Sequence, residues 1–170
     1  MTDWLPELRS EVPGPGSRER ARRLARVECP EVTCASEPPV FWERGRGSNV
    51  WDVDGNRFVD LSAGFGAAVL GYSHPEIADA VAAQAHRLQH ALGDVCPADV
   101  RLDLLEALER VLPGDLGHAI LSASGSDAVE SALKTALIAT GRAGVVAFEG
   151  AYHGLGLGAL DATHRAAFRE

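Results

Sequence analysis

Residues 118–148 read HAILSASGSDAVESALKTALIATGRAGVVAF, and the pattern of apolar, small and polar residues changes three times along them. Residues 118–122 and 145–148 are short, apolar and β-prone, which predicts two buried strands. Between them, the small residues 124–126 predict a tight loop and residues 127–140 a helix. Two strands joined through a helix run parallel, so we expect an α/β fold with helices on the faces of a parallel sheet.

The ends of this helix also carry sequence signals. Asp127 is followed three residues later by Glu130, the arrangement of a capping box, which predicts that the helix begins at Asp127. Gly141 follows the last helical residue, where glycine accepts the left-handed conformation of a C-terminal cap.

The loop before the helix has the composition of a phosphate site. Gly125 lets a ligand approach the backbone, the first helical turn offers unpaired N–H groups, and the hydroxyls of Ser124 and Ser126 add donors. An ordinary capped helix after a glycine-containing turn explains this segment about equally well. The lysine and spacing of a P-loop are missing, which disfavours nucleoside triphosphate chemistry.

A second polar segment, Phe148-Glu-Gly-Ala-Tyr-His-Gly154, directly follows the second predicted strand. Ligands of open α/β sheets lie beyond the carboxyl ends of the strands, so Tyr152 and His153 are expected close to the phosphate loop. The aromatic ring could stack on a flat heteroaromatic cofactor. A core tyrosine beside a solvent-facing histidine is the alternative.

The N-terminal half predicts smaller elements. Its first 17 residues, rich in proline and glycine, suggest a loose arm, and an arginine-rich helix follows. Residues 48–60 predict a hairpin that turns at Asp54-Gly55. Apolar stripes predict helices from Pro75 to Leu88 and over residues 98–112.

Composition narrows the class of protein. The chain has 170 residues, 46% of them hydrophobic, and a net charge of −8, which is typical of a globular protein and argues against nucleic acid as a partner. It contains no apolar run of membrane-spanning length and no signal-peptide pattern, so we expect no membrane and a cytoplasmic location. His86 and His90 lie four residues apart, but without further ligands no metal site is predicted.

Four segments in order resemble the class III aminotransferases, which are fold-type I pyridoxal-phosphate enzymes. They are Asp52–Asp60, Leu70–Pro75, Ser124–Lys134 and Phe148–Gly154, and the resemblance runs from about Val40 to the end of the chain. It implies an N-terminal arm and helix (residues 1–47), a hairpin and substrate-entrance loop of the small domain (48–74), and the first part of the large cofactor-binding domain (75–170), with an incomplete sheet.

The resemblance also implies the site. Gly125 and Ser126, with Ser124 beside them, would bind the phosphate of pyridoxal 5′-phosphate. Tyr152 would stack on the pyridine ring with His153 next to it, and Phe65 would line the substrate entrance.

One family component has no counterpart here. The single lysine, Lys134, lies four residues after Glu130 and about 12 Å along the helix from Ser126, so we expect a surface ion pair with Glu130 and not a Schiff-base lysine. We therefore expect an N-terminal fragment that is catalytically inactive in isolation, with no catalytic residue among its own.

The implied activity of the intact enzyme is transamination between an amine or amino acid and a 2-oxo acid, in a homodimer. Two alternatives stay open: an aminomutase or decarboxylase on the same scaffold, and a non-catalytic protein that binds a phosphate ligand or assists assembly.

Overall fold

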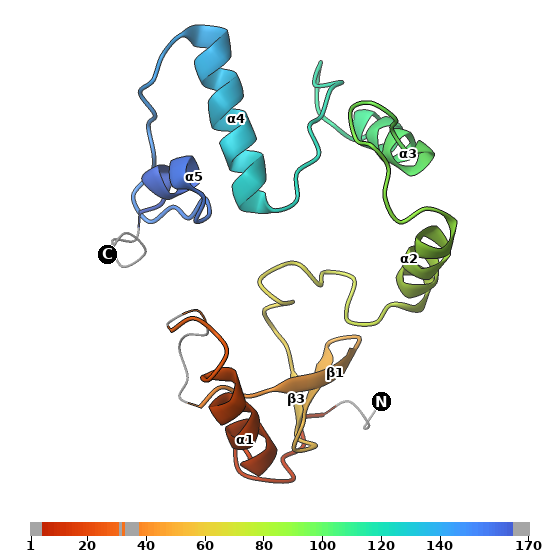
Figure 1. The fold of residues 1–170 in the computed structure, drawn as a ribbon, viewed down its shortest axis with the longest axis vertical. Helices are drawn as coiled ribbons and strands as arrows, with labels where there is room; N and C mark the ends of the chain where they lie inside the picture. Colours follow the sequence, from red (N-terminus) through yellow and green to blue (C-terminus); the bar gives the residue numbers. More distant parts are fainter. Residues whose placement is uncertain (1–4, 31, 33–37, 165–170) are drawn as a thin grey trace. The chain divides into compact units, whose positions relative to one another are not determined.

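The structure is a computed structural model, and it describes residues 5–30, 32 and 38–164. The chain divides into two compact units, residues 1–90 and 91–170. The elements of the first unit are α1 (Pro15–Leu24), β1 (Trp42–Arg46), β2 (Asn49–Asp52), β3 (Arg57–Val59) and α2 (Pro75–Arg87). Those of the second are α3 (Asp99–Glu109), α4 (Gly125–Thr140) and α5 (Leu157–Ala162) (Figure 1). None of the helices within the described ranges has the length and apolar character needed to cross a membrane.

The first unit is built on a three-stranded antiparallel sheet in the order β1-β2-β3. The predicted hairpin is confirmed: β2 pairs with β3, and Gly55 in the turn between them has a φ of +83°, which favours glycine. Strand β1 was not predicted, because its sequence, Trp-Glu-Arg-Gly-Arg, shows no apolar alternation. It gains its hydrogen bonds from β2.

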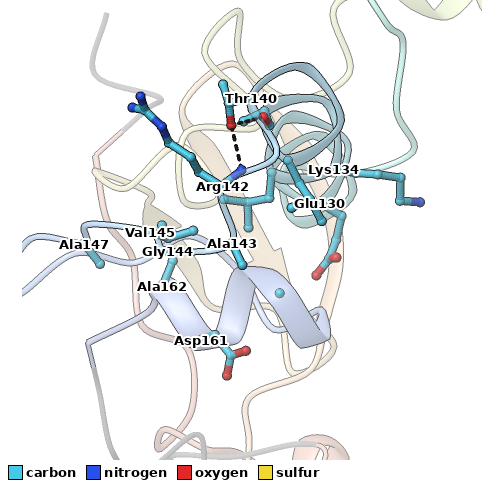
Figure 2. Close-up of a pocket in the computed structure, with 14 residues that line it drawn as sticks. Glu130, Lys134, Thr140, Arg142, Ala143, Gly144, Val145, Ala147, Asp161 and Ala162 are labelled. Carbon is cyan, nitrogen blue, oxygen red and sulfur yellow. Dashed lines mark hydrogen bonds between the residues drawn. The ribbon is translucent and has the colours of Figure 1, made fainter.

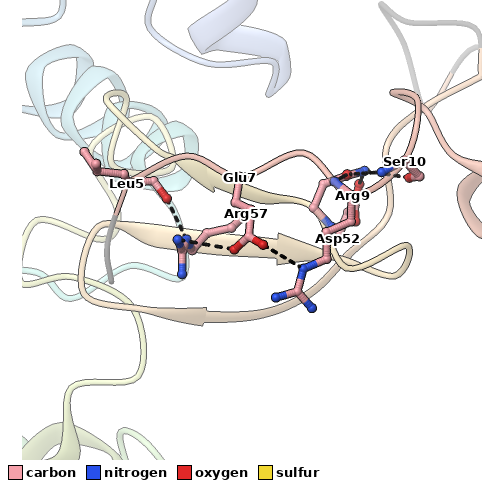
Figure 3. Close-up of polar contacts among 7 residues, drawn as sticks. Leu5, Glu7, Arg9, Ser10, Asp52 and Arg57 are labelled. Carbon is pink, nitrogen blue, oxygen red and sulfur yellow. Dashed lines mark hydrogen bonds and ion pairs between the residues drawn. The ribbon is translucent and has the colours of Figure 1, made fainter. Parts of the chain in front are cut away.

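The N-terminal arm is attached to this sheet, so the prediction of a loose arm is wrong. Because β3 lies at the sheet edge, its outer backbone groups are free to pair. Glu7 and Arg57 exchange two backbone hydrogen bonds of 2.9 and 2.8 Å, and the Arg57 guanidinium donates to the carbonyl of Leu5 (Figure 3). The fully buried Asn56 side chain accepts the N–H groups of Arg9 and Ser10 at 2.7 and 2.9 Å.

The hairpin turn also supplies the N-terminal cap of α1. The residue before this helix is Gly14, which has no side chain to cap it. Instead, the carboxylate of Asp54 accepts the N–H groups of Gly16 and Ser17 at 2.6 and 2.9 Å. Burial would raise the pKa of Asp54, but these hydrogen bonds outweigh it and lower the pKa below its usual range.

A second carboxylate holds the loop between β3 and α2. Asp60 accepts the N–H and hydroxyl of Ser62, the N–H of Gly64 and the hydroxyl of Tyr72, all between 2.6 and 2.8 Å. Within this loop Ala63 and Phe65 have φ angles of 50° and 56°, which side-chain-bearing residues rarely adopt. The Asp60 contacts offset the cost of these two strained residues.

The helix predicted from Pro75 to Leu88 is confirmed as α2 in the first unit. The helix predicted over residues 98–112 is confirmed as α3 in the second unit. The predicted strands at 118–122 and 145–148 are not formed, and among the described residues these segments have no strand partner. Their apolar side chains are exposed, Val146 to 91% and Phe148 to 81%. A buried strand forms only when neighbours supply hydrogen bonds and cover its faces, and neither is present here.

Asp54→Ala should destabilise the first unit by about 1 kcal/mol at neutral pH, because two N–H groups at the start of α1 lose their acceptor. Urea titration followed by tryptophan fluorescence would measure this, since Trp42 and Trp51 lie on the sheet. The folded-state pKa of Asp54 is lowered. Its contribution is therefore complete above the unfolded pKa of about 3.9 and disappears as the pH falls through the folded value.

The matched control is Asp79→Ala on the exposed surface of α2, which should change the free energy of unfolding by less than about 0.5 kcal/mol. Equal effects of the two substitutions, or a difference that does not shrink in acid, would contradict the cap.

The hydrogen bond to Asp60 raises the pKa of the Tyr72 phenol, because the phenolate could not donate and would face a negative charge. Asp60→Asn should therefore lower the pKa of Tyr72. In a Tyr152→Phe background the phenolate absorbance comes from Tyr72 alone and can be titrated directly. Ser62→Ala, which keeps the Asp60–Tyr72 contact, should leave the pKa raised; a fall of the same size in both variants would show that the contact is not its cause.

Candidate cofactor-binding site

The site is built on the first turn of α4. The helix begins at Gly125, and Ser124 is its N-cap, with its hydroxyl accepting the N–H of Asp127 at 3.2 Å. The Asp127 carboxylate turns back to accept the N–H of Ala123 at 3.0 Å. The predicted start at Asp127 is therefore wrong by two residues, and the capping pair is Ser124 with Asp127 in place of Asp127 with Glu130. The predicted end is confirmed, since Gly141 caps the helix with a φ of +67°.

This early start places the small residues inside the helical turn. The N–H groups of Gly125 and Ser126 find no acceptor among the described residues, as expected for the first residues of a helix. A Cβ built on Gly125 would meet no described atom beyond its chain neighbours and its own helix within 4 Å, so the space beside this residue is open. Two unpaired donors at the positive end of a 16-residue helix form an anion-binding arrangement.

The hydroxyl of Ser126 connects this turn to the second predicted segment. It accepts the N–H of Gly156 at 2.8 Å. Gly154, which is buried and has a φ of +114°, lies so close that a Cβ there would be 2.5 Å from the Cβ of Ser126. The structure thus brings Ser124, Gly125 and Ser126 together with the loop that carries Tyr152 and His153.

Tyr152 and His153 are held by their backbone and are only partly covered. The N–H of His153 donates to the hydroxyl of the fully buried Thr163 at 3.0 Å. Tyr152 is 61% exposed, which leaves its ring accessible to a planar ligand. Phe65, the sixth predicted position of the site, is fully exposed and belongs to the first unit, whereas the α4 turn belongs to the second.

Two residues of this region were not predicted in the roles that they have. Glu130 was expected to pair with Lys134, but no ion pair joins them in the described chain. Glu130 accepts the N–H of Ala159 at 2.9 Å instead, and its side chain points from α4 toward α5 while Lys134 points elsewhere (Figure 2). The other residue is Thr163, whose hydroxyl accepts the N–H of His153. The sequence feature that could have indicated the contact of Glu130 with α5 is the pair of glycines at 156 and 158, which leave room for its carboxylate.

A cavity of about 640 Å³ lies beside this contact, between α4, the segment after it and α5 (Figure 2). Its lining is mixed, with apolar side chains such as Leu137 and Val145 and the charged side chains of Lys134, Arg142 and Asp161. The described residues contain no cluster of three or more metal-ligating side chains, at this cavity or elsewhere.

Known aminotransferases and transaminases are similar to this chain in sequence and in structure. The 5-aminovalerate aminotransferase DavT of Pseudomonas aeruginosa is 43% identical over 117 residues, which are 68% of this chain and 28% of that protein. An (S)-enantioselective omega-transaminase from Thermomicrobium roseum superposes with a TM-score of 0.80 at 25% identity, over 96% of this chain and 38% of the other. A transaminase solved with PLP bound gives 0.74 at 28% identity, over 82% of this chain and 33% of the other.

The chain therefore spans between 28% and 38% of the length of these three proteins. The expected α/β class with an incomplete sheet is confirmed, because both transaminase folds match most of this chain. The small sheet among the described residues is antiparallel, however, and not parallel as predicted. The sequence model of the family described as "Aminotransferase class-III" matches residues 33–169, in agreement with the resemblance. The chain belongs to the class-III aminotransferase family.

Proposed function

We propose that this protein serves pyridoxal-phosphate-dependent transamination between an amine or amino acid and a 2-oxo acid. Membership of the class-III aminotransferases supports this reaction. The observation that carries the proposal is the first turn of α4, where the N–H groups of Gly125 and Ser126 have no acceptor among the described residues and the Ser126 hydroxyl binds the segment that follows Tyr152.

The donor set of this turn fits a phosphate dianion. The N–H groups of Gly125 and Ser126 would donate to phosphate oxygens, supported by the helix dipole. A hydroxyl can accept one hydrogen bond and still donate its own proton. Because the Ser126 hydroxyl already accepts from Gly156, its proton would be free for the phosphate. The carboxylate of Asp127, in the same helical turn, accepts the N–H of Ala123.

The loop after residue 148 would hold the cofactor ring. Tyr152 would stack on it, with His153 beside it, and the exposed ring of Tyr152 supports this role. The cofactor, when bound, supplies an electron sink for carbanion chemistry at the substrate's α-carbon. This chain's own contribution would be to bind and orient that group. Phe65 would line the substrate entrance, from a loop that Asp60 holds in a strained form.

Lys134 has no part in this proposal. It lies two turns beyond Ser126 on α4, and its side chain is exposed. The three-part organisation with boundaries after residues 47 and 74, the homodimer and the cytoplasmic location remain predictions from the sequence.

Ser126→Ala should weaken binding of pyridoxal 5′-phosphate by at least about tenfold, because the chain loses a charge-assisted hydrogen bond to the phosphate and also the acceptor for the N–H of Gly156. Equilibrium titration of the purified chain by cofactor absorbance would measure this. Pyridoxal, which lacks the phosphate, should bind weakly to both proteins. Ser131→Ala, on the same helix but one turn further along, is the matched control and should bind like the unchanged chain. If the unchanged chain does not prefer the phosphorylated form, the proposed phosphate site is wrong.

Treating the cofactor-loaded chain with borohydride should leave Lys134 unmodified, because it is too far along α4 from the first turn to reach a ring held at Tyr152. Peptide mass spectrometry would check this. A reduced cofactor adduct on Lys134 that forms at a stoichiometric cofactor concentration would contradict the assignment.

A further inference from the structure

Segment 150–163 is held on α4 by hydrogen bonds at two defined points. Ser126 and Glu130 are four residues apart, so their side chains lie on the same face of α4, one turn from each other. Ser126 accepts the N–H of Gly156 at 2.8 Å, and Glu130 accepts the N–H of Ala159 at 2.9 Å. One helix face therefore binds two N–H groups that lie three residues apart.

The Glu130 contact serves as the missing cap of α5. Gly156 is the N-cap of this short helix and offers no side-chain acceptor, and Ala159 is its third residue, whose N–H a cap would normally bind. The glycines admit the carboxylate: a Cβ at Gly156 would lie 2.8 Å from the Glu130 Oε1, and one at Gly158 would lie 3.0 Å from its Oε2. Ala159 itself is fully buried, so its N–H has no access to water as a substitute.

Further hydrogen bonds join the C-terminal end of α5 to the loop that carries Tyr152. Thr163 follows α5 directly and is fully buried. Its hydroxyl lies 3.0 Å from the carbonyl oxygens of Gly154 and Ala159 and accepts the N–H of His153 at 3.0 Å. The N–H of His164 donates to the carbonyl of Ala151 at 2.8 Å. The turn around Tyr152 is thus hydrogen-bonded to the C-terminal end of α5 on both of its sides.

We propose that Glu130 and Thr163 are positioning residues of the cofactor site: Glu130 fixes α5 on α4, and Thr163 transmits that position to the Tyr152–His153 turn. This inference rests on the proposed function and deepens it. Neither residue would touch the cofactor; both would set where the ring of Tyr152 stands relative to the donors of Gly125 and Ser126.

The test compares two probes on the purified chain, pyridoxal 5′-phosphate and inorganic phosphate. Glu130→Ala should weaken the cofactor by about tenfold and leave phosphate affinity within about twofold, because only the larger probe needs the Tyr152 turn. Glu130→Gln keeps an oxygen acceptor for Ala159 and should restore most of the cofactor affinity. Lys134→Ala is the control for a truncation elsewhere on α4 and should change neither. Equal weakening of both probes, or no weakening of either, would overturn the inference.

A double-mutant cycle distinguishes positioning from general loss of stability. If Glu130 acts through Tyr152, Glu130→Ala should have no further effect on cofactor affinity in a Tyr152→Ala chain. Additive losses would overturn the inference. Thr163→Val, which removes the hydroxyl at constant shape, should reproduce the Glu130→Ala result, whereas Thr163→Ser should bind like the unchanged chain.

Amide hydrogen exchange tests the positioning role without any cofactor. The amides of His153 and Ala159 should lose protection in Glu130→Ala, while amides of α3 keep theirs. Unchanged protection of His153 would overturn the positioning role even if the unchanged chain binds cofactor well. Conversely, a chain that binds no cofactor but shows this loss of protection would overturn the proposed function and keep the connection from Glu130 to the turn.

Discussion

The candidate site depends on the hydrogen bond from the N–H of Gly156 to the hydroxyl of Ser126. It joins the start of a 16-residue helix to a loop 30 residues further along the chain. A hydroxyl is suited to this position because it accepts the structural bond and retains a proton to donate. A carboxylate there could not donate, and an alanine could do neither. The close contact of Gly154 with the same side chain then excludes any larger residue at position 154.

The first unit is organised around a polar turn more than around an apolar core. Val50 is the one large apolar residue that is fully buried in its described part, whereas Asp52 and Asn56 are both completely inaccessible to solvent. Asp52 accepts the N–H groups of Asp54 and Asn56 and the amide of the Asn56 side chain, at 2.7–3.0 Å. Each such bond adds only about 1 kcal/mol net, but a buried partner left unpaired costs as much or more. The turn therefore specifies where the arm and α1 attach, in addition to reversing the chain.

Sequence reasoning succeeded where the signal was local. The helices α2 and α3 follow from apolar spacing and the hairpin from Asp54-Gly55, because neighbours in the chain determine both. It failed where a partner far along the chain decides the outcome. The arm is fixed by Asn56, some 46 residues away, and β1 by its pairing with β2. The strands expected at 118–122 and 145–148 failed for the same reason, since apolar composition indicates burial but cannot supply a neighbouring strand. At the site, the two segments could be chosen from composition, whereas their contact through Ser126 and Gly154 could not.

The free energies of two possible contacts explain why Glu130 binds the distant Ala159 and not the nearby Lys134. An exposed Glu–Lys pair four residues apart on a helix is worth about 0.2–0.5 kcal/mol, and salt screens it. A hydrogen bond between a carboxylate and a buried N–H contributes about 1.5–3 kcal/mol, because the N–H would otherwise remain unpaired. Glu130 therefore binds the N–H of Ala159 once the fold brings the two within reach, and Lys134 stays exposed to solvent. The helix α5 was not predicted from the sequence. Once it is known, its glycine N-cap, which has no side chain to accept a hydrogen bond, shows that it requires an acceptor from elsewhere in the chain. Matching such uncapped helices to unassigned carboxylates is therefore a better guide to this region than pairing each glutamate with its nearest lysine.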